Sequence, residues 1–212
     1  MKSSTLSLID TLLAKSPALI SERQHLLDAT ELICECFDSG HHLYICGNGG
    51  SASDAEHIVG EFVKAFRKKR YIPQETKEKF AAMYASDAEL MEHVQIGFPA
   101  HSLVGGTAIM TAIINDLGGE YVYAQQANAY IQEGDVLIGI STSGNSVPVQ
   151  HAMKIAKFKG GKTLAMTGKS GGNMATLADL TLRSTEQETY LVQQDHIILY
   201  HIVCAAVEEE LT

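Results

Sequence analysis

Two acid–base side chains, His57 and Glu61, lie four residues apart in a segment, residues 52–66, that is expected to be helical. Four residues are about one helical turn, so both side chains are expected on the same face. A carboxylate and an imidazole can move a proton near neutral pH, and both are common zinc ligands. The pair therefore predicts a proton-transfer or metal site, although such a pair taken alone is more often an ordinary surface pair.

The expected C-terminal helix, residues 188–210, carries Gln193, Gln194, His196 and His201. His196 and His201 diverge by roughly 140° around a helix, so they are not expected to serve one centre. Gln193 and His201 are separated by roughly 80° and by about 12 Å along a straight helix. If both serve one centre, either the helix begins or bends between them or two subunits contribute; we favour two subunits. Alone, His201 on an apolar helix is more often a core or interface residue.

Two loops rich in glycine and hydroxyl groups each follow an expected strand and begin an expected helix. In the first, residues 47–53, glycines allow backbone N–H groups to approach an anion, and Ser51 and Ser53 add hydroxyls. The second, residues 141–146, has four hydroxyl side chains in six residues. Either loop alone could be a turn with a helix cap, but two in one chain favour phosphate binding. Neither has a nucleotide-binding pattern, so no nucleotide cofactor is expected.

The segments that must position these groups alternate between strand and helix. Strands are expected at residues 42–46, 101–104, 135–140, 162–166 and 179–182, and helices at 52–66, 107–114, 120–131, 146–158 and 188–210. Such alternation predicts a parallel sheet with helices on both faces and ligands outside the carboxyl ends of the strands. We expect an α/β fold with a doubly wound, five-stranded, flavodoxin-like parallel sheet.

Residues 1–40 are expected to form a helical arm of two amphipathic helices with a break near Pro17. The arm could pack on a partner subunit or cover its own sheet, and the pattern leaves both possibilities open. Residues 41–212 are expected to form the remainder of a single structural domain, because 212 residues suit one large α/β domain.

Composition and charge bound the partners and the compartment. The net charge of −9 argues against general nucleic-acid binding, which needs a basic surface. The four cysteines, Cys34, Cys36, Cys46 and Cys204, include no Cys-x-x-Cys pair and are expected to be reduced thiols. No uninterrupted apolar run follows the N-terminus and no stretch reaches membrane-spanning length, so a cytoplasmic protein is expected.

Several motifs together resemble those of the SIS-domain phosphoheptose isomerases. They are CGNGGSASDAEH at residues 46–57, Asn115-Asp116, GDVLIGISTSGNS at residues 134–146, TGKSGG at residues 167–172, and VQQDH at residues 192–196 followed by His201. The resemblance covers nearly the whole chain, and the run GISTSGNS is highly specific to that family.

The resemblance implies an aldose–ketose isomerase that converts sedoheptulose 7-phosphate to D-glycero-D-manno-heptose 7-phosphate through an enediol. It implies a homotetramer with active sites between subunits. Glu61 would take the carbon proton, and His201 would act on the oxygen side. It also implies one zinc ion, catalytic or structural, at the positions His57, Glu61, Gln193 and His201. The implied substrate-binding positions are Asn48, Gly49, Gly50, Ser51, Glu61, Asn115, Asp116, Ser141, Thr142, Ser143, Ser146 and Gln193.

The chain departs from the family pattern in three places. An extra segment at about residues 67–99 contains an expected helix at 73–82 and is expected to reshape the pocket entrance. Ala65 stands where an arginine is typical, and Tyr190 stands where an acidic residue is usual, three before Gln193. These departures bear on which sugar phosphate the pocket accepts rather than on the reaction type.

Two other functions compete with this interpretation. One is an isomerase or binding module for another sugar phosphate, which the extra segment favours. The other is a non-enzymatic SIS regulator that binds the replication initiator, which the presence of both Glu61 and His201 disfavours. An etherase acting on phosphorylated amino sugars is a weaker alternative.

Overall fold

The apolar runs before the two glycine-rich loops are neighbouring strands of one parallel sheet. The computed structural model describes residues 1–212, and the sheet has the strand order β2-β1-β3-β4-β5 with every pair parallel. The strands are β1 (Leu43–Gly47), β2 (Ala100–Ser102), β3 (Val136–Ser141), β4 (Lys162–Thr167) and β5 (Leu180–Arg183). The predicted doubly wound, flavodoxin-like sheet is thereby confirmed.

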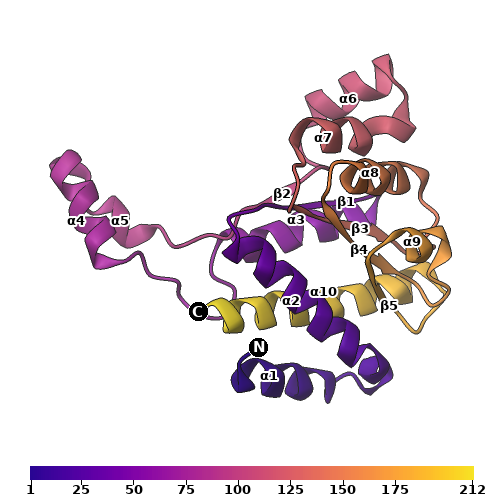
Figure 1. Ribbon diagram of the computed structural model, residues 1–212, viewed down its shortest axis with the longest axis horizontal. Helices are drawn as coiled ribbons and strands as arrows, with labels where there is room; N and C mark the ends of the chain where they lie inside the picture. The colour runs from indigo at the N-terminus through magenta and orange to yellow at the C-terminus, as the bar shows by residue number, and fades with distance from the viewer.

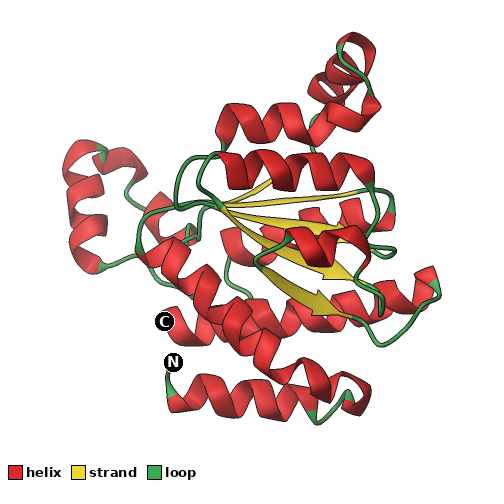
Figure 2. Cartoon of the chain, turned by 45° about the vertical axis from the view of Figure 1, so that its right-hand side comes forward, coloured by secondary structure: helices red, strands yellow, loops and turns green.

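Helices cover both faces of the sheet (Figure 2). They are α1 (Ser3–Leu13), α2 (Arg23–Asp38), α3 (Gly50–Val63), α4 (Gln74–Met83), α5 (Leu90–His93), α6 (Thr107–Asp116), α7 (Val122–Tyr130), α8 (Val147–Phe158), α9 (Gly172–Leu177) and α10 (Thr189–Leu211), with 3-10 turns η1 (Pro17–Glu22), η2 (Ala85–Asp87) and η3 (Gly119–Tyr121). All the expected long helices are present, whereas the short α5 and α9 were not expected. None of these helices has both the length and the apolar character needed to cross a membrane.

Alternate residues of the strands supply two separate hydrophobic cores. Leu43 and Ile45 of β1 pack with α2, α3 and α10, whereas Tyr44 and Cys46 face α7 and α8 on the other side. This alternation is the expected consequence of the period-two geometry of a strand buried on both faces. All the cysteines are buried and unpaired, as the sequence predicts for reduced thiols.

The N-terminal helices lie against their own chain. Helix α2 covers the sheet beside α10, and α1 packs on the outer side of α10 (Figure 1). The backbone N–H of Lys2 and the hydroxyl of Thr5 both donate to Glu210 Oε2, at 2.8 and 2.7 Å, so the two termini lie side by side. Of the two possibilities that the sequence leaves open, α2 takes the second and covers the chain's own sheet. Contact of the arm with a partner subunit stays a prediction.

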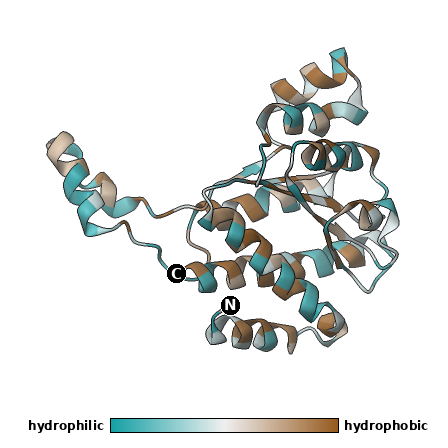
Figure 3. Ribbon diagram, in the orientation of Figure 1, coloured by the Kyte–Doolittle hydropathy of each residue, from teal (hydrophilic) through white to brown (hydrophobic).

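The extra segment projects from the body of the molecule. Helices α4 and α5 extend away from the sheet (Figure 1), and hydrophilic residues prevail on them (Figure 3). No residue of α4, η2 or α5 is buried. The expected additional helix is α4, and the segment lies at the opposite end of the sheet from the two glycine-rich loops (Figure 2). Within one chain it therefore does not cover those loops.

A buried carboxylate anchors the loop that leads from α3 into the extra segment. Glu208 of α10 is 2% exposed, and its oxygens accept hydrogen bonds from the backbone N–H groups of Phe66, Arg67 and Lys68 at 2.8, 2.7 and 3.0 Å. The buried Arg70 guanidinium lies 3.5 Å from Glu208 and 4.3 Å from the centre of the Phe98 ring. Glu208 thus ties the end of α3 to the C-terminal helix.

Candidate functional site

The two glycine-rich loops meet where the strand order reverses. They follow β1 and β3, which are adjacent in the sheet, and this reversal is where open α/β sheets bind ligands. Asn48 Nδ2 of the first loop donates to Ser146 Oγ of the second, at 2.8 Å. The Tyr123 hydroxyl lies 2.6 Å from the carbonyl oxygen of Gly47 and 2.9 Å from Oδ1 of Asn48. The structure thus brings together the loops predicted to bind a phosphate.

The second loop requires glycine at its tip. Gly144 has φ +67°, and a Cβ there would collide with the carbonyl oxygen of Gly171. The backbone N–H of Gly168, just after β4, donates to the carbonyl of Thr142 at 2.9 Å, which ties the second loop to the segment that follows β4. The hydroxyls of Ser141 and Ser143 lie 3.5 Å apart. This packing leaves clustered hydroxyl and amide groups that suit an anion.

His57, Glu61 and His201 form a second group, on α3 and α10. His57 Nε2 lies 3.1 Å from Glu61 Oε1 and 3.5 Å from His201 Nε2, and one ligand atom from each residue lies within 4.8 Å of the others. His57 and Glu61 share one face of α3, as their spacing predicts. Their meeting with His201 depends on the packing of α10 beside α3, which no local pattern specifies.

Charged and aromatic neighbours surround this group. Lys64 Nζ lies 3.0 Å from Glu61 Oε2, so a lysine supplies the cation beside Glu61 where the sequence has Ala65 in place of an arginine. The Phe66 ring stacks on the His201 ring, with centroids 5.4 Å apart. Burial, and secondarily the nearby His57, lower the pKa of His201 below its usual value, which favours a neutral imidazole.

The donor set of this group fits a zinc ion. Ligand nitrogens at about 2.0–2.1 Å from a tetrahedral zinc lie about 3.3 Å from one another. The separations of 3.1 and 3.5 Å around His57 Nε2 bracket that value. Two imidazoles and a carboxylate are also a donor set that zinc accepts while keeping a further position open.

Gln193 is not brought into this group within one chain. Its side-chain amide lies against Gly50 at the start of α3, where a Cβ on Gly50 would collide with it. Helix α10 begins at Thr189 and continues through Leu211, so it does not begin between Gln193 and His201. Eight residues of helix separate them by about 12 Å along the axis. Gln193 therefore lies at the first glycine-rich loop rather than at the histidines.

Asn115 and Asp116 lie at the C-terminal end of α6. The Asn115 side-chain amide donates to Asp116 Oδ1 at 2.8 Å, and both residues are exposed. No hydrogen bond joins either residue to the two loops. Their predicted role in substrate binding is neither supported nor contradicted by this placement.

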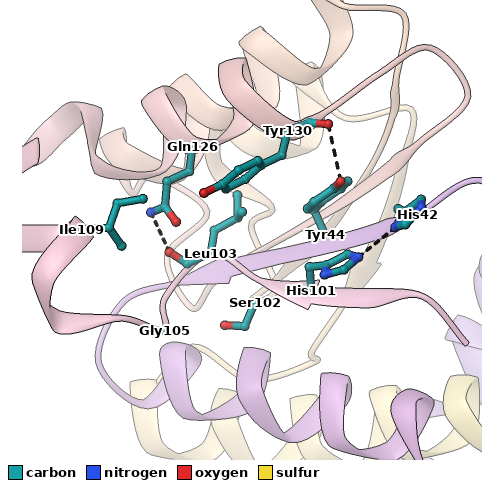
Figure 4. A pocket seen from close by; sticks show the side chains of 9 residues that line it. All are labelled: His42, Tyr44, His101, Ser102, Leu103, Gly105, Ile109, Gln126 and Tyr130. Carbon is teal, nitrogen blue, oxygen red and sulfur yellow. Dashed lines mark hydrogen bonds between the residues drawn. The ribbon is translucent and has the colours of Figure 1, made fainter. Parts of the chain in front are cut away.

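A different pocket, of about 430 Å³, lies along the edge strand β2 (Figure 4). His42 Nδ1 and His101 Nε2 are 2.8 Å apart there, and the Gln126 amide donates to the Leu103 carbonyl at 2.8 Å. The pocket contains none of the residues predicted from the sequence. Its two imidazoles are fewer than the donors of ordinary zinc sites. The group formed by His57, Glu61 and His201 is therefore the stronger candidate.

Sequence reasoning missed Tyr200, which contacts the candidate site, and Asp54, which contacts Tyr200. The Tyr200 hydroxyl lies 2.9 Å from His57 Nδ1 and 3.4 Å from Asp54 Oδ1. A signal existed for each, because Asp54 is three residues before His57 on α3 and Tyr200 immediately precedes His201. Only the packing of the two helices shows that Tyr200 reaches the His57 imidazole and that Asp54 contacts the Tyr200 hydroxyl.

Comparison with known proteins gives consistent similarities over most of the chain. The SIS domain family matches residues 13–96 and 109–207. A phosphoheptose isomerase of Citrifermentans bemidjiense is 37% identical over 86% of this chain and 82% of its own length, and that of a Roseiflexus species is 40% identical over 85% and 79%. The solved phosphoheptose isomerase of Neisseria gonorrhoeae is 30% identical, with a TM-score of 0.74 and 94% of each chain covered. That of Francisella tularensis is 26% identical, with a TM-score of 0.75 over 96% of this chain and 93% of that one.

Proposed function

Because the chain belongs to the phosphoheptose isomerase family of SIS-domain proteins, we propose that it interconverts sedoheptulose 7-phosphate and D-glycero-D-manno-heptose 7-phosphate. The observation that carries the proposal is that His201 of α10 meets His57 and Glu61 of α3, the helix that begins at the first glycine-rich loop. A ligand can therefore be held by its phosphate while acid–base groups lie further along the same helix.

The two loops would hold the phosphate. The hydroxyls of Ser141, Thr142, Ser143 and Ser146, with the N-terminal ends of α3 and α8, supply neutral donors and partial positive charge. His57 is seven residues beyond Gly50, which places it about 10 Å from the loop along α3. The substrate would thus extend from the loops toward the acid–base group, which consists of His57, Glu61 and His201.

Proton transfer would be divided between a carboxylate and an imidazole. Glu61 would take the proton from C1 of the ketose while the C2 carbonyl oxygen gains a proton, which gives the enediol. Return of a proton to C2 and loss of the C1 hydroxyl proton would then give the aldose. His201 would exchange the oxygen protons, because its neutral ring has one N–H and one lone pair.

A zinc ion is the metal that His57, Glu61 and His201 would hold. When bound, such an ion would polarise the carbonyl of the sugar. Gln193 of a second copy would complete the ligand set in an oligomer, since the same residue of one chain lies at Gly50. We propose a homotetramer with active sites between subunits, located in the cytoplasm.

Zinc content tests this part of the proposal. We expect purified protein to bind about one zinc per chain, and His201→Ala to weaken binding by more than about 100-fold, because a direct ligand is lost. His93→Ala is the matched control, since His93 is an exposed histidine on the projecting α5. Equal zinc affinity in the two variants, measured by chelator competition, would show that His201 is not a zinc ligand.

Turnover of sedoheptulose 7-phosphate tests the reaction itself. Zinc-supplemented protein incubated with this ketose in D₂O is expected to form the aldose, with deuterium at C2, when followed by NMR. Deuterium enters at C2 when the protonated base exchanges with solvent before it returns a proton to the enediol. Binding without turnover or exchange would contradict the proposed activity on this sugar.

Another sugar phosphate is the second candidate substrate. The observation that favours it is local to the acid–base group, where Lys64 rather than an arginine faces Glu61. Parallel assays with a pentose and a hexose phosphate ketose would show which chain length is converted fastest. A higher kcat/KM for one of them would change the substrate and leave the reaction type unchanged.

A further inference from the structure

Asp54, Tyr200 and His57 form a connected series of polar groups behind the candidate metal site. Asp54 and His57 lie on one face of α3, and Tyr200 reaches both from α10. The Asp54 side chain is buried, with the residue 8% exposed, and its Oδ2 has no hydrogen-bond partner. The Tyr200 hydroxyl, 3.4 Å from Oδ1, is the sole hydrogen-bond partner of this carboxyl group.

The single proton of the Tyr200 hydroxyl determines the direction of the hydrogen bonds in this series. A hydroxyl donates one hydrogen bond, and its two neighbours here are the Asp54 carboxyl group and His57 Nδ1. Buried carboxylate oxygens without a donor are costly, so the Tyr200 hydroxyl must donate its hydrogen bond to Asp54. The Tyr200 oxygen must then accept from His57, which requires a proton on Nδ1.

A proton on Nδ1 determines what His57 presents to the opposite side. A neutral imidazole has one N–H and one lone pair, so Nε2 then carries the lone pair. Nε2 is the atom that faces Glu61 Oε1 at 3.1 Å and His201 Nε2 at 3.5 Å. Hydrogen bonds to the far nitrogen of a ligating histidine commonly set its tautomer and orientation in this way.

We propose that Tyr200, itself oriented by Asp54, is a positioning residue that keeps the His57 proton on Nδ1 and presents the Nε2 lone pair to the metal site. This inference rests on the metal site of the proposed function. It assigns roles to Tyr200 and Asp54 that neither the acid–base mechanism nor the ligand set requires.

The tautomer of His57 is read directly from the ¹⁵N chemical shifts of its ring. The experiment uses metal-free, full-length protein with ¹⁵N-labelled histidine at pH 8.5, where an ordinary imidazole is neutral, and His57→Gln assigns the signals. The wild-type ring is expected to be protonated at Nδ1. Protonation at Nε2 would overturn the proposal without any variant, because Tyr200 would then be donating to His57.

Tyr200→Phe removes the hydroxyl and keeps the ring in the core. The His57 signals are expected to move toward a mixture of tautomers, and zinc affinity is expected to fall by about 10- to 100-fold. Tyr44→Phe is the matched control, because Tyr44 is also a buried tyrosine but lies on the other face of the sheet. An unchanged tautomer in Tyr200→Phe, or an equal loss of zinc affinity in both variants, would overturn the proposal. The spectra need neither metal nor substrate, so their outcome is separate from any failure of isomerase turnover.

Discussion

Glu61→Gln is expected to lower kcat for aldose–ketose exchange by about 10²- to 10⁴-fold, the usual contribution of a positioned general base. The amide keeps the size of the side chain but cannot take a carbon proton. Loss of proton exchange between the sugar and D₂O should accompany the loss of turnover, because both need the same base. Steady-state kinetics and NMR exchange on the same preparation measure the two effects.

Glu56→Gln is the control for this substitution. Glu56 lies on the same helix and carries the same charge, but it belongs to neither the loops nor the histidine group. It is expected to leave kcat unchanged. Wild-type turnover in Glu61→Gln would remove Glu61 as the base.

Zinc affinity of Glu61→Gln separates the two roles that Glu61 could have. Glu61 Oε1 faces His57, whereas Oε2 faces Lys64. If turnover is lost while zinc affinity stays near that of the wild type, Glu61 acts mainly as a base. If both are lost together, the carboxylate is needed as a zinc ligand.

The features predicted from the sequence are those that depend on neighbouring residues. The strand after which each loop begins, the hydroxyl groups of residues 141–146, and the shared face of His57 and Glu61 all follow from local periodicity. The doubly wound sheet follows from the regular alternation of such segments. Helix α9 is not predicted from the sequence because it has only six residues and begins with glycine, so it shows no helical periodicity.

Features that depend on packing between distant segments could not be predicted from spacing. The placement of His201 beside His57, of Gln193 beside Gly50, and of Tyr200 between two residues of α3 depends on how α10 lies along α3. Sequence spacing correctly indicates that Gln193 and His201 are too far apart for one centre in one chain. Sequence spacing cannot indicate which of these two residues lies beside His57 and Glu61.

Glu208→Ala is expected to lower the free energy of unfolding by about 3–5 kcal/mol, the range for removing one partner of a buried ion pair. The substitution leaves the N–H groups of Phe66, Arg67 and Lys68 without their acceptor and the buried guanidinium of Arg70 without its ion-pair partner. For a chain of 212 residues this corresponds to a fall in Tm of about 6–20 °C. Urea unfolding and thermal scans at one fixed protein concentration measure the change.

The adjacent Glu209 provides the matched control for Glu208. Its side chain pairs with Lys68, whose own side chain is substantially exposed to solvent. Such surface pairs contribute about 0–1 kcal/mol, so Glu209→Ala should change stability little. Equal stability of the two variants would contradict the anchoring role assigned to Glu208. In Arg70→Ala/Glu208→Ala, the combined loss should be smaller than the sum of the single losses, because neither charge is left buried alone.

Glu208→Ala should also disturb the group formed by His57, Glu61 and His201. Glu208 is two helical turns beyond His201 on α10, and it holds the backbone of Phe66, whose ring stacks on His201. Release of this loop removes the support on one side of the His201 ring, while His57 and Glu61 remain on α3. Turnover should therefore fall at temperatures where Glu208→Ala is still folded, and Glu209→Ala should not show this loss. One buried carboxylate would thus link the stability of the C-terminal helix to the geometry of the acid–base group.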